Sequence, residues 1–412
     1  MMACARRALL GGAVVMLAAC GGAPTTGDDG PAPAGSQLPR LSATADGRPV
    51  LSWVEPDGDA GHRLRYSRLD ADGWRAPVTV ARGSGWFVNW ADVPSVVPLT
   101  DTLWAAHWLV SQGRGTYAYD VALATSTDGG RTWSAPITPY PDDSPTEHGF
   151  VSIWAEPGPS GDAEVGLAWL DGRHMVLDPA RGHDDPRTTL RAAVVAPDGQ
   201  RRAEEVIDDR VCDCCPTSAT RTPAGTFVAY RDRTAAEIRD IHVARRGDDG
   251  WQRLGAVAAE GWHITGCPVN GPAIAAGGDV VAVAWYTEAG GKRRVRSARR
   301  RLDGGGWSEP VDVATDTPAG RVGLTWVTDD VFALSWLEDL GDGAAAVRVV
   351  TVDDAGPGSV TTAATTGAGR RAGVPRIAGI GGDVLVAWTS WHDDVPRVRV
   401  TRLPDLAERG RR

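Results

Sequence analysis

The chain has 412 residues, of which 42% are hydrophobic and 23% charged, so it can bury a substantial core in one large domain or two ordinary ones. Its formal net charge is −9, and acidic residues are interspersed with basic ones. This pattern lacks the basic stripe of a nucleic-acid-binding surface and argues against a nucleic-acid partner. The 51 Gly and 28 Pro residues favour many tight turns over long helices.

The N-terminal segment has the pattern of an export signal. Arg6-Arg7 precedes the apolar run Ala8–Ala18, which is too short to span a bilayer as a finished helix. The run ends in small residues before Cys20, which resembles the lipidation motif of bacterial lipoproteins. We therefore expect residues 1–20 to be a lipoprotein signal peptide and residues 21–37 to be a flexible Gly/Pro/Ser tether. The predicted location is the cell envelope, facing the periplasm or the exterior, with membrane contact through the lipid anchor only.

One module recurs through residues 38–412, which we expect to form a single domain. Each copy has a short apolar strand, a Gly/Asp turn and a second apolar strand that ends near an aromatic residue. The period is roughly 50 residues, as in propellers built from four-stranded blades. The sequence therefore predicts an all-β fold, a β-propeller of four-stranded blades, with seven blades preferred and six as the alternative. The seven aromatic residues are Trp53, Trp108, Trp169, Tyr230, Trp285, Trp336 and Trp388.

The seventh copy, from Val374 to Pro404, is too short for an outer strand, and we expect that residues near Gln37 could supply it by closing the ring. A second motif lies in the second copy, where Ser126 to Trp133 fits S-x-D-x-G-x-T-W in full. It predicts a hairpin turn in which the Asp accepts backbone N–H groups and Gly takes the left-handed conformation. Shorter versions occur at Asp70–Trp74, Asp248–Trp251 and Asp303–Trp307.

This motif resembles the Asp box of the sialidase-like, BNR-repeat β-propellers, and several further segments resemble a bacterial lipoprotein branch of them. The resemblance implies exo-α-sialidase chemistry, a glycoside hydrolysis that uses three Arg, a Tyr nucleophile with a Glu partner, and an Asp acid/base. The Arg-Ile-Pro motif of the family is absent. Pro39-Arg40-Leu41 and Pro375-Arg376-Ile377 are the nearest matches, in reversed order, which argues against true exo-sialidase activity.

In a propeller, the residues before each innermost strand and after each second strand meet on one face around the axis, which is a preferred place for a pocket. We expect a glycan or a small anionic ligand there. The candidate catalytic residues are Asp171, Arg173, Arg231, Asp232 and His148. The candidate ligand-binding residues are Trp90, Asp92, Glu147, Trp262 and His263.

Four cysteines remain after the signal: Cys212, Cys214, Cys215 and Cys267. In an exported protein they favour disulfides, either Cys215–Cys267 with Cys212–Cys214 or a vicinal Cys214–Cys215 bond. The alternative is a copper or zinc site, or a redox function, in which His263 or His148 adds a nitrogen ligand. A third possibility is an envelope scaffold whose polar face binds another protein.

Overall fold

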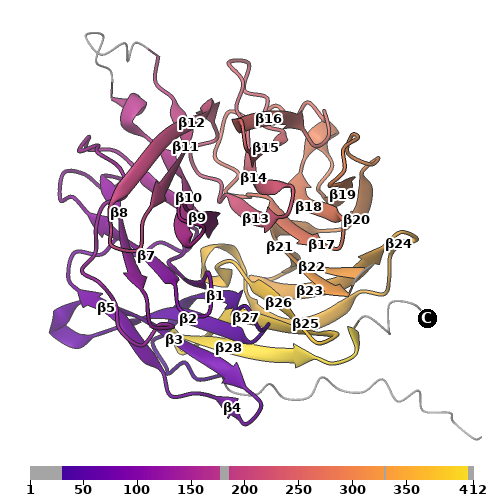
Figure 1. Ribbon diagram of the computed structural model, residues 1–412. Helices are drawn as coiled ribbons and strands as arrows, with labels where there is room; N and C mark the ends of the chain where they lie inside the picture. Colours follow the sequence, from indigo (N-terminus) through magenta and orange to yellow (C-terminus); the bar gives the residue numbers. More distant parts are fainter. Residues whose placement is uncertain (1–29, 177–184, 329–330, 407–412) are drawn as a thin grey trace, which may run out of the picture.

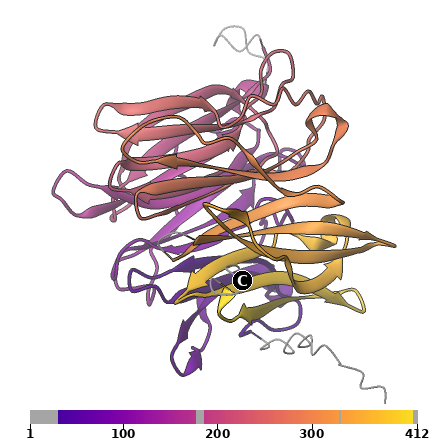
Figure 2. The same ribbon diagram turned by 90° about the vertical axis from the view of Figure 1, so that its right-hand side faces the viewer.

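The computed structural model describes residues 30–176, 185–328 and 331–406, so the predicted signal peptide and Cys20 lie outside the described residues. Its strands form seven antiparallel sheets, which follow one another around a ring in chain order (Figure 1). This confirms the predicted all-β propeller and decides for seven blades over six. Seen from the side, the later blades lie face to face (Figure 2). Among the described residues, no helix is both long and apolar enough to cross a bilayer.

Within each blade the strands pair in the order of their labels, except that β4 and β5 both pair with β3, and β24 and β25 both pair with β23. Blade 1 contains β1 (Gln37–Ala43), β2 (Pro49–Pro56), β3 (His62–Asp70), β4 (Gly73–Trp74) and β5 (Val78–Gly83). Blade 2 contains β6 (Ser95–Pro98), β7 (Trp104–Ser111) and β8 (Tyr119–Ser126). Blade 3 contains β9 (His148–Pro157), β10 (Ala163–Asp171), β11 (Thr188–Val195) and β12 (Arg201–Val211). Blade 4 contains β13 (Ser218–Thr222), β14 (Gly225–Arg231), β15 (Ile241–Gly247) and β16 (Gly250–Ala256).

The remaining blades follow the same plan. Blade 5 contains β17 (Ala273–Gly277), β18 (Val280–Thr287), β19 (Arg294–Arg301) and β20 (Val311–Ala314). Blade 6 contains β21 (Pro318–Thr328), β22 (Val331–Gly341), β23 (Ala344–Asp353), β24 (Gly356–Pro357) and β25 (Thr361–Gly367). Blade 7 contains β26 (Arg376–Ile380), β27 (Asp383–His392) and β28 (Val395–Leu403). The described helices are short 3₁₀ turns: η1 (Gly58–Ala60), η2 (Arg173–Met175), η4 (Ala289–Gly291) and η5 (Gly369–Ala372).

Blades 2 and 7 have three regular strands each, and single bridges supply their outer edges. In blade 2, Leu123 of β8 forms an antiparallel bridge with Ile137. In blade 7, Arg397 of β28 forms one with Ala34, so the N-terminal part of the propeller closes the ring beside the last blade. Ala32 and Ser36 are buried there, which means that this part of the segment expected to be a flexible tether is packed onto the fold.

The repeated aromatic residues lie in the packing between blades, as predicted. Trp53, Trp169, Trp285 and Trp336 are each at most 1% exposed. Two of these buried indoles donate their N–H to an acid two residues further along the strand: Trp53 to Glu55 at 2.7 Å and Trp169 to Asp171 at 2.8 Å. A buried indole N–H needs an acceptor. In these two blades, the acid at the end of the second strand therefore accepts a hydrogen bond from a core Trp.

The turn that follows β8 has the local geometry predicted from its motif. The Asp128 carboxylate accepts the Thr132 backbone N–H at 2.9 Å and the Thr132 hydroxyl at 2.7 Å. Gly129 and Gly130 both have positive φ, at 75° and 85°. These bonds hold the pKa of Asp128 at about 2.

Candidate functional site

A pocket of about 730 Å³ lies where the loops that precede β6, β9, β13 and β17 meet. Its walls include two aromatic side chains, Trp90 and Phe150, and the carboxyl group of Glu147. Cys214, Cys267 and the acidic residue Asp213 line the same pocket. The volume lies within the range of small-molecule sites.

Behind the pocket wall, Tyr119 joins two acids. Its hydroxyl lies 2.6 Å from Oε1 of Glu147 and 3.0 Å from Oδ2 of Asp92. One phenol proton cannot serve two carboxylates, so the arrangement favours a proton on one of the acids. Burial raises the pKa of Asp92 to about 7 and that of Glu147 to about 7. The pair can therefore hold and release a proton near neutral pH.

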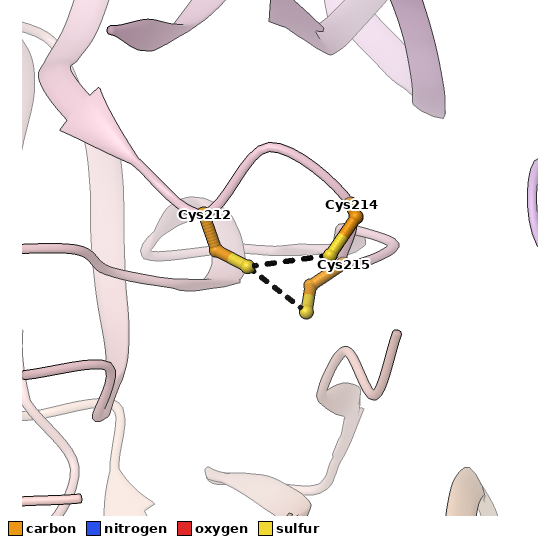
Figure 3. Close-up of side chains that lie close together, drawn as sticks. All are labelled: Cys212, Cys214 and Cys215. Atoms are coloured by element: carbon orange, nitrogen blue, oxygen red, sulfur yellow. Dashed lines mark hydrogen bonds between the residues drawn. The ribbon is translucent and has the colours of Figure 1, made fainter. Parts of the chain in front are cut away.

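The cysteines form a sulfur cluster, defined here as Cys212, Cys214, Cys215 and Cys267. The Cys212 sulfur lies 3.2 Å from that of Cys215 and 3.8 Å from that of Cys214 (Figure 3). Cys214 also interacts with Cys267, which reaches it from the next blade. All four are free thiols in the structure, so none of the expected disulfides is formed in it. The 3.2 Å contact, Cys212 to Cys215, belongs to neither of the predicted pairings.

A cation lies beside the cluster. Nη1 of Arg239 lies 3.3 Å from the Cys212 sulfur and 3.5 Å from Asp213. Burial acts to raise the pKa of Cys212, but hydrogen bonds from Cys214 and Cys215 and the charge of Arg239 more than offset it. The pKa of Cys212 lies well below its usual value. Cys212 is therefore the thiol that the surroundings prepare as a thiolate.

The ligand atoms of the cluster lie close enough together to share one metal ion, and the 3.2 Å between the Cys212 and Cys215 sulfurs would widen when an ion binds. The sulfurs of Cys212, Cys214 and Cys215 lie within 4.8 Å of one another, and so do the ligand atoms of Asp213, Cys214 and Cys267. Two thiolates at about 2.3 Å from a tetrahedral ion are about 3.8 Å apart. The distance from Cys212 to Cys214 has this value. Neither His263 nor His148 belongs to these groups of described residues, so the predicted nitrogen ligands do not join the cluster.

Three of the predicted catalytic residues form a separate ion-pair network. Asp171 accepts two bonds from Arg173, at 2.7 and 2.6 Å, and Arg173 also pairs with Glu204 at 3.0 Å. His148 bonds Asp142 at 3.0 Å and lies 3.8 Å from Asp171. Burial lowers the pKa of His148, but these acids more than offset it, and the pKa lies above its usual value. None of the three lines the pocket beside the cysteines.

Arg231 is a structural residue in this arrangement, although the sequence suggested an anion-binding role. Its guanidinium group is 1% exposed and donates to the backbone carbonyls of Asn270, Arg239 and Tyr286 at 2.6 to 3.0 Å. Trp262 is buried against it, with the guanidinium carbon 4.7 Å from the ring centroid. Backbone carbonyls thus take four hydrogen bonds from the Arg231 guanidinium group, and neither Arg231 nor Trp262 lines the pocket.

The last two predicted residues lie apart from the sulfur cluster. Asp232 lies 3.6 Å from His242, and burial followed by the charge of Asp208 raises the pKa of Asp232 to about 7. Asp208, Asp232 and His242 bring their ligand atoms together, with Arg253 paired to Asp208 at 2.8 Å. His263 is exposed, and its backbone bridges Ile238.

Sequence reasoning missed Tyr119 and Arg239 as parts of the site. The repeat places Tyr119 only in an outer strand of blade 2, and the signal that could have found it is that a buried phenol needs an acceptor. Arg239 lies in a loop, and no spacing in the sequence relates it to Cys212. Of the predicted residues, the structure brings together Trp90, Glu147, Cys214 and Cys267 around the pocket, with Asp92, Cys212 and Cys215 directly behind.

No protein-family model and no curated protein matches this chain. Solved structures that resemble it are propellers at low identity. A protein of unknown function from Dyadobacter fermentans is 13% identical, with a TM-score of 0.47 over 89% of this chain and 95% of that one. A leech intramolecular trans-sialidase is 12% identical, with a TM-score of 0.47 over 88% and 83%. The β-propeller domain of the trilobed protease of Pyrococcus furiosus is 9% identical, with a TM-score of 0.46 over 93% and 98%. None of these similarities assigns an activity to the chain.

Proposed function

We propose that this protein binds a thiophilic metal ion, copper(I) or zinc, through the sulfur cluster beside the pocket. The observation that carries the proposal is the convergence of the Cys212, Cys214 and Cys215 sulfurs, with Cys267 next to Cys214. Thiolates are the ligands that copper(I) and zinc prefer. Arg239 offsets the negative charge that several thiolates on one ion would build up.

The position of the cluster favours exchange of the ion with a partner over a purely structural role. Cys212 and Cys215 are buried, whereas Cys214 and Cys267 are open to the pocket. An ion held by Cys214 can therefore be reached from outside. Structural zinc sites are closed by comparison.

The test is metal binding by the full chain, purified under reducing and anaerobic conditions. Titration with copper(I) or zinc against a chromophoric chelator should give one ion per chain. Cys214→Ser should weaken the affinity by more than about 100-fold, since even the loss of a supporting contact outside the ligands costs 10- to 100-fold. His263→Ala is the matched control and should leave the affinity unchanged. Metal-free protein with its cysteines in disulfides would refute the proposal.

A second candidate is action on a glycan, as the Asp-box motif suggests. Glu147 favours it, because this acid lines a pocket with Trp90 and Phe150 and has a pKa near 7. Such an acid can donate a proton to a leaving oxygen. Hydrolysis of fluorogenic glycosides, sialosides included, that is lost in Glu147→Gln would support it. Activity that Glu147→Gln retains, or no hydrolysis together with no binding on a glycan array, would count against it.

We also propose that the chain is exported and anchored through a lipid on Cys20. The support is the sequence pattern before that residue. Mass spectrometry of the envelope-bound protein should find a lipidated Cys20 as the first residue. Cys20→Ala should release the protein from the membrane fraction, and an unchanged membrane association would contradict the anchor.

A further inference from the structure

A second cavity, of about 160 Å³, lies along the axis of the propeller. Its walls are innermost strands of five blades: β1, β13, β17, β21 and β26, with the residues just before them. Three of the lining residues are Arg40, Arg321 and Arg376, and no Asp or Glu is among the described residues that line it. A chain whose net charge is −9 thus has a cationic channel at its centre.

Two of these guanidinium groups have no hydrogen-bond or ion-pair partner among the described residues. Arg321 donates to the carbonyls of Gly369 and Gly373 at 2.7 and 2.8 Å. By contrast, the side chains of Arg40 and Arg376 make no hydrogen bond or ion pair with any residue in the described part of the chain, and Nε of Arg376 is buried without an acceptor. Burial lowers the pKa of both groups below the usual value, and for Arg376 the charge of Arg40 adds to this effect.

A nearby histidine, His107, also has a ring nitrogen without a hydrogen-bond partner among the described residues. His107 is fully buried, its Nδ1 lies 2.8 Å from the Ser95 hydroxyl, and its Nε2 has no partner among the described residues. Burial, together with the charge of Arg40, lowers the pKa of His107 to about 3. A neutral imidazole therefore lies near Arg40, and no carboxylate among the described residues pairs with Arg40 or Arg376.

Two like charges that line one cavity without a counter-ion repel each other, and the buried Nε of Arg376 has lost water without gaining an acceptor. An anion between them would restore both hydrogen bonds and charge balance. The guanidinium fork matches an oxyanion, since it offers parallel N–H groups to two oxygens. At about 30 Å³ per water molecule, the cavity has room for about five waters or one small ion.

We infer that the axial channel is a binding site for one small oxyanion of the phosphate or sulfate class, held between Arg40 and Arg376. The site is separate from the sulfur cluster, although Val269 lines both cavities. If no oxyanion binds in the channel, the proposal of a metal site still stands, because neither of the two guanidinium groups contacts a cysteine in the described part of the chain.

The test is calorimetric titration of the wild-type chain with phosphate, sulfate, acetate and chloride at one ionic strength. Phosphate or sulfate should bind with saturation at one site per chain and raise the midpoint of thermal unfolding. Arg40→Met and Arg376→Met should each weaken binding at least about tenfold, the loss expected for charge-assisted hydrogen bonds. The double variant should not bind, and without oxyanion it should be at least as stable as the wild type. Arg82→Met, on an exposed edge strand, is the control and should bind normally.

A second measurement needs no variant. A wild-type crystal soaked in selenate should show one anomalous peak between the guanidinium groups of Arg40 and Arg376. A peak only elsewhere, equal effects of chloride and phosphate, or binding that survives in the double variant would overturn the assignment. Waters alone in the channel at saturating oxyanion would do the same.

Discussion

At the scale of single residues, Asp92 makes the fold sensitive to pH. Its pKa rises from 3.8 to about 7 because the carboxyl group is buried. Between these values the folded chain keeps a proton that the unfolded chain has lost, so the free energy of unfolding falls as pH rises from about 4 to about 7. A shift of this size corresponds to at most about 4 kcal/mol.

We predict that Asp92→Asn flattens this dependence. Asn can still accept the Phe150 N–H, which lies 2.8 Å from Oδ1, and it carries no charge at high pH. Urea unfolding at pH 5 and pH 8 should show a smaller loss of stability in the variant than in the wild type. Glu147 titrates in the same direction, so part of the slope should persist, and Glu147→Gln is the companion variant. Equal slopes in wild type and Asp92→Asn would show that Asp92 is ionised when folded.

Arg231 gives the second prediction at this scale. Lys keeps the positive charge but cannot reach the three carbonyls that the guanidinium group connects. Arg231→Lys should therefore lower the free energy of unfolding by about 2–4 kcal/mol, since buried carbonyls lose their donors. Arg233→Lys, whose partner is Glu237 four residues along the chain, is the control and should cost less than about 1 kcal/mol. A stable Arg231→Lys that has lost ligand binding would restore the role first suggested by the sequence.

At the scale of elements, β9 approaches the acid pair so closely that only Gly fits at position 149. A Cβ there would lie 1.9 Å from Oδ2 of Asp92 and 2.9 Å from the Tyr119 ring. The next residue, Phe150, has a φ of 55°, and its N–H donates to Asp92. The backbone conformation at the start of β9 is therefore determined by its contacts with Asp92 and Tyr119.

Gly149→Ala should separate Asp92 from β9 and destabilise the fold by about 3 kcal/mol or more, as overpacking of a buried site does. Gly306→Ala is the matched control, because a Cβ at Gly306 meets no atom within 4 Å. Thermal unfolding of the two variants makes the comparison. Equal midpoints would mean that β9 can move away from Asp92 at little cost.

The same elements show what could be predicted from sequence. The repeated Trp positions predicted the blades because a strand that ends in a large buried side chain leaves a signal at every repeat. The acids two residues after Trp53 and Trp169 followed the same rhythm, and only the structure showed that they accept the indole N–H groups. The repeat pattern predicts which residues lie near the face around the axis, but it does not predict which groups their side chains contact.

At the scale of the whole molecule, the site depends on contacts between blades that the repeat cannot encode. Cys267 of one blade reaches Cys214 of the preceding one, and Arg239 reaches Cys212 from a loop. Arg40 and Arg376 come together on adjacent innermost strands, β1 and β26, because the first and last blades are neighbours. The channel therefore exists only when the ring is closed. The sequence predicted that residues near Gln37 complete the last blade, but it did not predict the channel.

Closure gives the last prediction. Residues 30–36 attach to β28 through three bonds: Gly35 N–H to Pro396 O at 2.7 Å, Val398 N–H to Ser36 Oγ at 2.9 Å, and Arg397 Nε to Ala32 O at 3.2 Å. Each bond contributes about 1 kcal/mol, and the entropy of ordering the segment offsets part of the gain. A chain beginning at residue 37 should thus be less stable than one beginning at residue 30 by about 1–3 kcal/mol in urea unfolding. It should also self-associate in light scattering, because the edge of β28 is left open. Ser36→Ala in the longer chain should speed hydrogen exchange at Val398 without association. Equal stability and equal mass of the two chains would show that the ring closes through blades 1 and 7 alone.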